Sequence, residues 1–332
     1  MAQLANNDPR SFSVTVLSRF NIDVKGTFDY DKFRVLCGRL FGADEVGEHE
    51  WRAREVFELF DANADGALND QELYRCCKWI NETINPVNVL LVVDVQNDFI
   101  DGALALRKCG HGQEGLEVIQ PINRILRDGR WDKVVYTHDW HPEDHISFFD
   151  NLALRELHPE SKVTKEKAKL FDTVVFLQPH LTQVLWPRHC VKNTWGAELH
   201  KDLLILPSSE RIYKGQQSDK EVYSAFEKDT DDSKPAELVK ILTAAGATHL
   251  YVCGLAYDVC VKHTCLGGLR LGYRLAVIDD CCRGVKPDGV TVAKKLITEN
   301  GGLVTHTDRV LSLVNEGKRS LVMAHHAAKF MK

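Results

Sequence analysis

The sequence lacks an apolar run of about 18 residues, the length that a membrane-spanning helix needs, so no membrane partner is expected. It also lacks a basic block. The 42 Lys and Arg residues stand against 47 Asp and Glu residues, a formal net charge of −5, which gives no support for a nucleic acid partner. The sequence does not fix the oligomeric state.

A secretory signal is also missing. The first residues, MAQLANNDPRSFS, show no charged stretch followed by an apolar one. We therefore expect a cytoplasmic protein, with the nucleus as an alternative. Ten cysteines without such a signal favour free thiols over a disulfide framework.

An internal repeat occupies the N-terminal part of the 332-residue chain. FNIDVKGTFDYDKF (20–33) and FDANADGALNDQEL (60–73) align at an offset of 40 residues. The second copy fits the EF-hand calcium loop, in which oxygen ligands surround the ion and a glycine permits the turn. The predicted calcium ligands are Asp61, Asn63, Asp65, the Ala67 carbonyl, Asn69 and Glu72. Apolar residues on one helical face flank the loop on both sides: Val56, Phe57 and Phe60 before it, and Leu73, Cys76, Cys77 and Ile80 after it.

The first copy departs from this pattern. Lys25 and Lys32 replace two anionic ligands, so we expect no calcium there and a structural role for residues 10–40. The sequence thus predicts an EF-hand pair over 1–83 with one calcium ion. Stabilisation of this domain is the expected role of the ion. Regulation is the alternative, because only residues 81–85 separate the pair from the next strand.

The periodicity changes after Pro86. Short apolar runs without alternation suggest strands buried on both faces of a parallel sheet. They lie at 88–94, 133–137, 202–206, 248–253, 274–278 and 303–306, with helical patterns at 114–128, 235–246 and 288–299. Alternating strands and helices predict an α/β fold with a doubly wound, mostly parallel sheet over 86–314, followed by a tail at 315–332. Active sites in such sheets lie beyond the carboxyl ends of the strands.

Residues 248–271, THLYVCGLAYDVCVKHTCLGGLRL, read as a strand, a turn and a helix. Asp258 is the expected N-cap, accepting the Val261 N–H, and Gly272 ends the helix. Cys260 then lies in the first turn, where free N–H groups and the helix dipole favour a thiolate and an oxyanion. A buried structural thiol is the alternative.

A second group of polar residues follows the strand at 133–137. Asp139 and His141 can turn toward one point, and a carboxylate with an imidazole suits zinc, with iron or manganese as alternatives. His189 and His145 are the candidates for a third ligand. His158 and His180 lie in the polar segment 150–182, which we interpret as an insertion without ligand spacing.

Five motifs together resemble the nicotinamidases of the isochorismatase-like cysteine hydrolases. They are VDVQNDF (93–99), DWHPEDHISF (139–148), WPRHCV (186–191), YKG (213–215) and GLAYDVCV (254–261). The resemblance implies a three-layer α/β/α fold and hydrolysis of nicotinamide to nicotinate and ammonia, feeding NAD salvage. It does not extend to the EF-hand pair.

The resemblance also implies a role for individual residues. The catalytic triad would be Asp94, Lys214 and Cys260, and the metal ligands Asp139, His141 and His189; His145 matches a position that ligates metal only in some members. The N–H groups of Ala256 and Cys260 would form the oxyanion hole, the Leu255–Ala256 bond would be cis, and Phe99, Trp186 and Tyr223 would wall the nicotinamide ring.

Two other functions stay open at this stage. Another amidohydrolase of the superfamily, acting on a carbamoyl or ureido substrate, would not need a metal that binds a pyridine ring. A calcium-binding protein with an inactive hydrolase domain is the non-enzyme alternative, against which the intact set Asp94, Lys214 and Cys260 counts.

Overall fold

Five helices precede the first strand in the computed structural model, which describes residues 8–23, 25–228 and 235–331. They are α1 (Pro9–Ser18), α2 (Tyr30–Phe41), α3 (Ala43–Glu48), α4 (Glu50–Phe60) and α5 (Asp70–Ile84). Local signals start them: the Asp29 carboxylate accepts the Lys32 N–H, and Asn69 forms a capping box with Glu72. Their apolar faces meet around Trp79, whose ring lies near Phe33 and Phe60.

The two repeat loops lie side by side. Asp29 and Ala67 form an antiparallel bridge, and the Leu68 N–H donates to the Phe28 carbonyl at 2.8 Å. The prediction that the helix faces around the second loop are buried is confirmed for every residue in the set Val56, Phe57, Phe60, Leu73, Cys76, Cys77 and Ile80. Part of the first loop, at position 24, falls outside the described residues.

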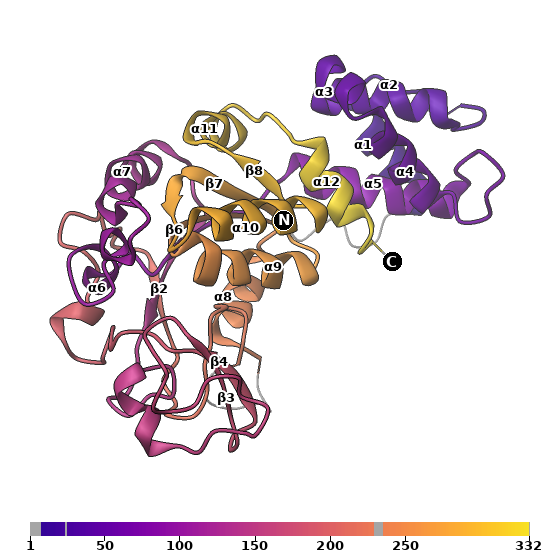
Figure 1. The fold of residues 1–332 in the computed structure, drawn as a ribbon. Coiled ribbons are helices and arrows are strands. Elements are labelled where there is room, and N and C mark those ends of the chain that lie inside the picture. Colours follow the sequence, from indigo (N-terminus) through magenta and orange to yellow (C-terminus); the bar gives the residue numbers. More distant parts are fainter. Residues whose placement is uncertain (1–7, 24, 229–234, 332) are drawn as a thin grey trace.

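A six-stranded sheet forms the centre of the remaining chain (Figure 1). Its order is β5 (Glu210–Lys214), β2 (Lys133–Asp139), β1 (Asn88–Val93), β6 (His249–Leu255), β7 (Arg274–Arg283) and β8 (Leu303–Thr305). Every neighbouring pair is parallel. The strands are continuous apolar runs because helices cover both sheet faces.

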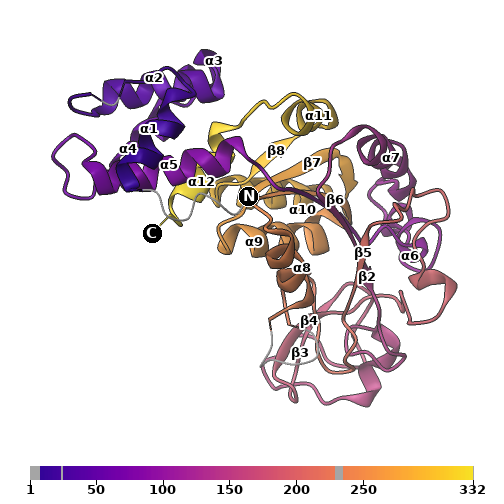
Figure 2. The same ribbon diagram turned by 180° about the vertical axis from the view of Figure 1, so that it is seen from behind.

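Helices flank the sheet on both sides (Figures 1 and 2). They are α6 (Asn97–Ile100), α7 (Ile119–Asp128), α8 (Glu237–Ala245), α9 (Lys262–Arg270), α10 (Pro287–Glu299) and α11 (Thr307–Asn315). The predicted three-layer α/β/α fold is confirmed. The helix expected over 114–128 is shorter, because residues 115–118 form a 3₁₀ turn before α7.

The strand predicted at 202–206 is wrong. This segment is a loop, and the edge strand is β5. Side chains satisfy the loop backbone: the Leu204 N–H donates to Asn123 Oδ1 at 2.7 Å, and the Tyr136 hydroxyl donates to the Leu204 carbonyl at 2.8 Å. Backbone groups that are paired in this way need no sheet neighbour.

The insertion at 150–182 contains the hairpin β3 (Thr173–Phe176) and β4 (Leu181–Val184). The hairpin brings together residues that showed no ligand spacing in the sequence. His158 Nδ1 lies 3.5 Å from one carboxylate oxygen of Glu160, and His180 Nε2 lies 3.8 Å from the same oxygen.

The described part of the tail, residues 315–331, contains a helix. Helix α12 (Leu321–Ala328) lies between the N-terminal helices and the sheet unit (Figures 1 and 2). Among the described residues, no helix is both long and apolar enough to cross a membrane.

Candidate active site

Three strands bring Asp94, Lys214 and Cys260 together at the carboxyl edge of the sheet. Asp94 follows β1, Lys214 ends β5, and Cys260 lies in a π-helical turn (Tyr257–Val261) after β6. Lys214 Nζ lies 2.8 Å from Asp94 Oδ2 and 3.4 Å from Cys260 Sγ. A carboxylate oxygen of Asp94 and Sγ of Cys260 lie within 4.8 Å of each other. All three side chains are buried.

Burial sets the charge state of this group. It raises the pKa of Asp94, which the charge of Lys214 only partly offsets. It also raises the pKa of the Cys260 thiol well above the usual value, despite the nearby Lys214. Burial therefore favours the neutral thiol of Cys260 over the thiolate that the helix dipole alone would favour.

The predicted N-cap at Asp258 is wrong. The Val261 N–H donates to the Ala256 carbonyl at 3.1 Å, as in a π-helical turn, and not to Asp258. The Asp258 carboxylate instead accepts the N–H groups of Val285 and Lys286 after β7, at 2.7 and 3.0 Å. These two hydrogen bonds attach the π-helical turn to the segment after β7, and α9 begins only at Lys262.

The strand before this turn passes very close to β1. A Cβ atom at Gly254 would lie 2.0 Å from the Val93 carbonyl oxygen, and φ is +121°, so only glycine fits there. The predicted cis bond between Leu255 and Ala256 is confirmed.

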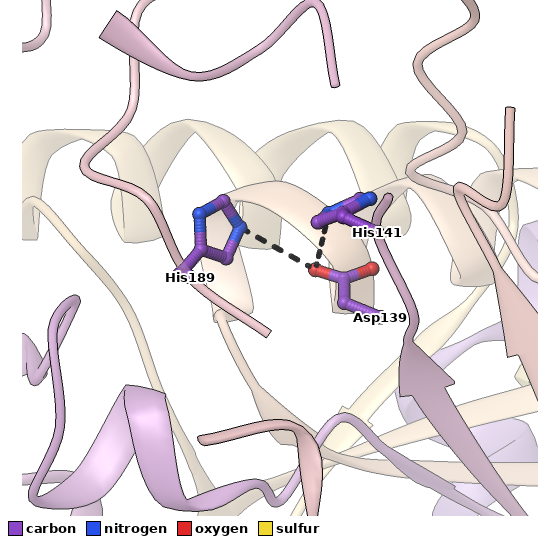
Figure 3. A group of neighbouring side chains, drawn as sticks. All are labelled: Asp139, His141 and His189. Atoms are coloured by element: carbon purple, nitrogen blue, oxygen red, sulfur yellow. Dashed lines mark ion pairs between the residues drawn. The ribbon is translucent and has the colours of Figure 1, made fainter. Parts of the chain in front are cut away.

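Asp139, His141 and His189 form a compact group that could hold a metal ion (Figure 3). Nε2 of His141 and Nε2 of His189 lie 3.7 and 3.8 Å from the same oxygen of Asp139. The opposite nitrogens face backbone carbonyls: His141 Nδ1 lies 2.8 Å from the Gly215 oxygen, and His189 Nδ1 lies 2.7 Å from the Pro187 oxygen. Carbonyls at Nδ1 fix the tautomer that leaves each Nε2 lone pair for a metal.

His145 is not part of this set. Its Nδ1 pairs with the Ser147 hydroxyl at 2.8 Å and its Nε2 with the Lys220 carbonyl at 3.1 Å, so both ring nitrogens have protein partners. Its ring stacks on His141, with 4.0 Å between the centroids. Burial lowers the pKa of His145 to about 2 and that of His189 to about 4, so both rings are neutral.

A cavity lies between Cys260 and the group formed by Asp139, His141 and His189, all of which line it. The aromatic residues expected to wall the substrate, Phe99, Trp186 and Tyr223, all line it. The Trp186 indole N–H donates to the Tyr223 hydroxyl at 3.2 Å, which sets the two rings relative to each other. The lining is largely apolar, and Cys260 and the imidazoles of His141 and His189 belong to it.

This fold and site agree with a known family. The model of the isochorismatase domain matches residues 88–309. The chain belongs to the isochorismatase family. The N-terminal helices and α12 lie outside the matched family segment.

Characterised members resemble the chain over most of their own length. The nicotinamidase of Saccharomyces cerevisiae is 35% identical over 217 residues, covering 63% of this chain and 93% of that protein. The nicotinamidase of Escherichia coli is 35% identical over 203 residues, covering 60% and 84%. The crystal structure of the yeast nicotinamidase Pnc1p bound to the inhibitor nicotinaldehyde aligns with a TM-score of 0.54 and 31% identity, covering 66% of this chain and 99% of that one.

Sequence reasoning missed one charged residue of this isochorismatase-family site. Glu221 lines the cavity beside the metal ligands, and burial raises its pKa. Its carboxylate accepts a 3.2 Å hydrogen bond from the Gln183 side chain on β4. It lies in a loop without regular structure, seven residues beyond Lys214, where no local pattern marks it.

Proposed function

We propose that this chain hydrolyses nicotinamide to nicotinate and ammonia through a thioester at Cys260, with the nicotinate feeding NAD salvage. The chain is then an amidohydrolase, as its nicotinamidase relatives are. The observation that carries the proposal is the cavity itself. Its lining includes the thiol of Cys260, which contacts the paired Lys214 and Asp94, as well as the imidazoles of His141 and His189 and three aromatic side chains.

The first half of the reaction makes the thioester. Asp94 takes the proton from Cys260 Sγ, and the thiolate forms a bond to the carboxamide carbon. The N–H groups of Ala256 and Cys260 receive the negative charge on the carboxamide oxygen. When the C–N bond breaks, Asp94 returns the proton to the nitrogen, which leaves as ammonia.

The second half restores the enzyme. Asp94 accepts a proton from water as the water attacks the thioester carbon, and it passes this proton to the Cys260 sulfur when the C–S bond breaks. The nicotinic acid loses its own proton to solvent and leaves as nicotinate. Lys214 stays charged throughout: burial alone would lower its pKa, but Asp139 and Asp94 raise it well above the usual value. Its charge stabilises the anionic states of both neighbours.

Asp139, His141 and His189 would hold a divalent metal, zinc by the nature of the donors, with iron or manganese also fitting. Such an ion would bind the pyridine nitrogen and fix the ring, so that the carboxamide faces Cys260. Asp139 serves both halves of the site, because its Oδ1 contacts Lys214 while its Oδ2 faces the two imidazoles.

The decisive experiment measures ammonia released from nicotinamide by the wild type and by Cys260→Ala. We expect turnover in the wild type and none in the variant, with the fold and metal content unchanged. Turnover of ureido or carbamoyl amides in place of nicotinamide would contradict the substrate, and substantial activity in Cys260→Ala would contradict the mechanism.

We further propose that the loop from Asp61 to Glu72 binds one calcium ion. Its donors are of the right kind, and several already point inward: Asp61 Oδ2 accepts the Gly66 N–H at 2.9 Å, and Glu72 Oε1 accepts the Ala62 N–H at 3.0 Å. Glu72 is buried, and its second carboxylate oxygen accepts the Asn69 N–H at 2.9 Å. The loop carboxylates are not among the groups of described residues that converge within 4.8 Å, so ion binding would draw them together.

A further inference from the structure

Helix α12 is buried along its whole length. One face of it completes the core of the N-terminal helices, to which Leu321, Ala324 and Ala328 belong. The other face points to the sheet unit, where Met323 joins the core. Among the described elements, only α12 therefore contributes side chains to both hydrophobic cores.

Polar contacts tie α12 to both helices that flank the proposed calcium loop. On α5, the Trp79 indole N–H donates to the Ala324 carbonyl at 2.8 Å. On α4, Glu55 accepts from His325 at 2.9 Å and pairs with Lys329 at 3.0 Å. The loop joins the end of α4 to the start of α5, so α12 spans the two elements whose relative position the loop controls.

The opposite side of α12 contacts the helix behind the nucleophile. His326 Nε2 lies 2.9 Å from the Leu269 carbonyl of α9, and this contact is buried. A Cβ atom at Gly301 would lie 2.5 Å from the His326 ring, so the ring has little room to move. Helix α9 continues directly from the turn that carries Cys260.

We propose that the N-terminal helices form an intramolecular helix-binding module whose ligand is α12, and that α12 links the calcium loop to α9. The link to calcium rests on the proposed ion site. Amphipathic helices seated between paired EF-hand helices are a common recognition mode, and calcium changes the angle between such helices. Here drawing Glu72 toward Asp61 shifts α5 against α4, and α12, which contacts both, transmits the shift to α9.

Coupling of this kind is reciprocal, so α12 must affect calcium binding as much as calcium affects α12. The first test is calcium affinity by calorimetry on the full-length chain. We expect Ala324→Arg, which forces a charged side chain into the interface, to weaken calcium binding by about fivefold or more. Val292→Arg on α10 is the matched control, because Val292 is 52% exposed, and it should bind calcium like the wild type. Leu321→Ala replaces Ala324→Arg if the latter does not fold.

The second test follows hydrogen exchange of α9 with and without calcium. In the wild type, calcium should slow exchange in α4, α5 and α9. His326→Leu removes the hydrogen bond to α9 and leaves the polar contacts of α12 with α4 and α5 in place, so it should keep the protection of α4 and α5 and lose that of α9. His326→Gln, which can still donate to Leu269, should restore part of it.

Two results would overturn the coupling: Ala324→Arg or Leu321→Ala binding calcium with wild-type affinity, or α9 protected equally in His326→Leu. If the wild type binds no calcium, the ion site fails by itself. Hydrogen exchange measured without calcium then tests whether the N-terminal helices bind α12. If they do, Ala324→Arg should release α12 and speed exchange in both α5 and α9 relative to Val292→Arg. Unchanged exchange would refute it.

Discussion

The Thr137 hydroxyl donates a 2.6 Å hydrogen bond to Oδ1 of Asp94, while Lys214 holds the other oxygen of the same carboxylate. Asp94 also has a left-handed backbone conformation, with φ of +48°, which few non-glycine residues adopt. The proposed base is thus held from two sides in an orientation that its own backbone would not favour. Thr137 lies on β2, one strand away, and no sequence motif pointed to it.

Thr137→Val should shift the pH profile of the enzyme. Burial raises the pKa of Asp94, and the bond from Thr137 lowers it, so loss of the hydroxyl raises it further. Activity requires the ionised carboxylate, so the acidic limb of kcat/KM should move to higher pH by about one unit. Thr137→Ser keeps the hydroxyl and should retain the wild-type profile. An unshifted limb in Thr137→Val would mean that Asp94 is not the base.

His189→Ala should lose metal and bind nicotinamide poorly, because Nε2 of His189 faces the shared Asp139 oxygen. His145→Ala should keep most of the metal, with an affinity loss of no more than about 10- to 100-fold, since His145 only packs against His141. Elemental analysis of the purified variants and the KM for nicotinamide measure both effects. Full occupancy without His189 and loss without His145 would reverse the assignment.

Tyr223→Phe should raise KM for nicotinamide about two- to tenfold with little change in kcat. The variant keeps the ring but leaves the Trp186 N–H without the hydroxyl that accepts it. Tyr213→Phe is the control, because Tyr213 is 38% exposed and does not line the cavity. A loss confined to kcat would argue that these rings do not position the substrate.

Calorimetry should find one calcium ion per wild-type chain and none at micromolar concentrations in Glu72→Gln. The bidentate carboxylate at the last loop position provides much of the affinity of such sites. Glu58→Gln, on the exposed face of α4, controls for the loss of one charge. A stoichiometry of two would show that Lys25 and Lys32 do not disable the first loop.

The sequence predicted the parts of the structure that depend on local pattern. Apolar runs such as 88–93 became central strands, and motif residues after these strands met at one edge because parallel strands end together. Prediction from the sequence failed where residues far along the chain determine the local structure. The apolar segment 202–206 became a loop because Asn123 and Tyr136 satisfy its backbone, and Asp258 turned to the backbone after β7 instead of capping its own helix.

Other features could not be seen before the chain was folded. Glu221 reaches the cavity from an irregular loop, and His180, in the turn between β3 and β4, meets His158 from an earlier segment that pairs with β3. The burial of α12 depends on two surfaces, one of them contributed by residues more than 200 positions away, such as Trp79. The sequence of a short helix without a hydrophobic period does not indicate which elements pack against it.

The cavity also determines which reagents can label the protein. Cys260 exposes only 4% of its surface and lines the same cavity as Phe99, Trp186 and Tyr223, so a small planar electrophile should reach it more readily than a bulky dye. Of the ten cysteines, nine are buried and Cys109 is half-buried. A pyridine carrying an aldehyde or another thiol-reactive group should therefore mark a single cysteine, which would allow intact active centres to be counted by mass spectrometry.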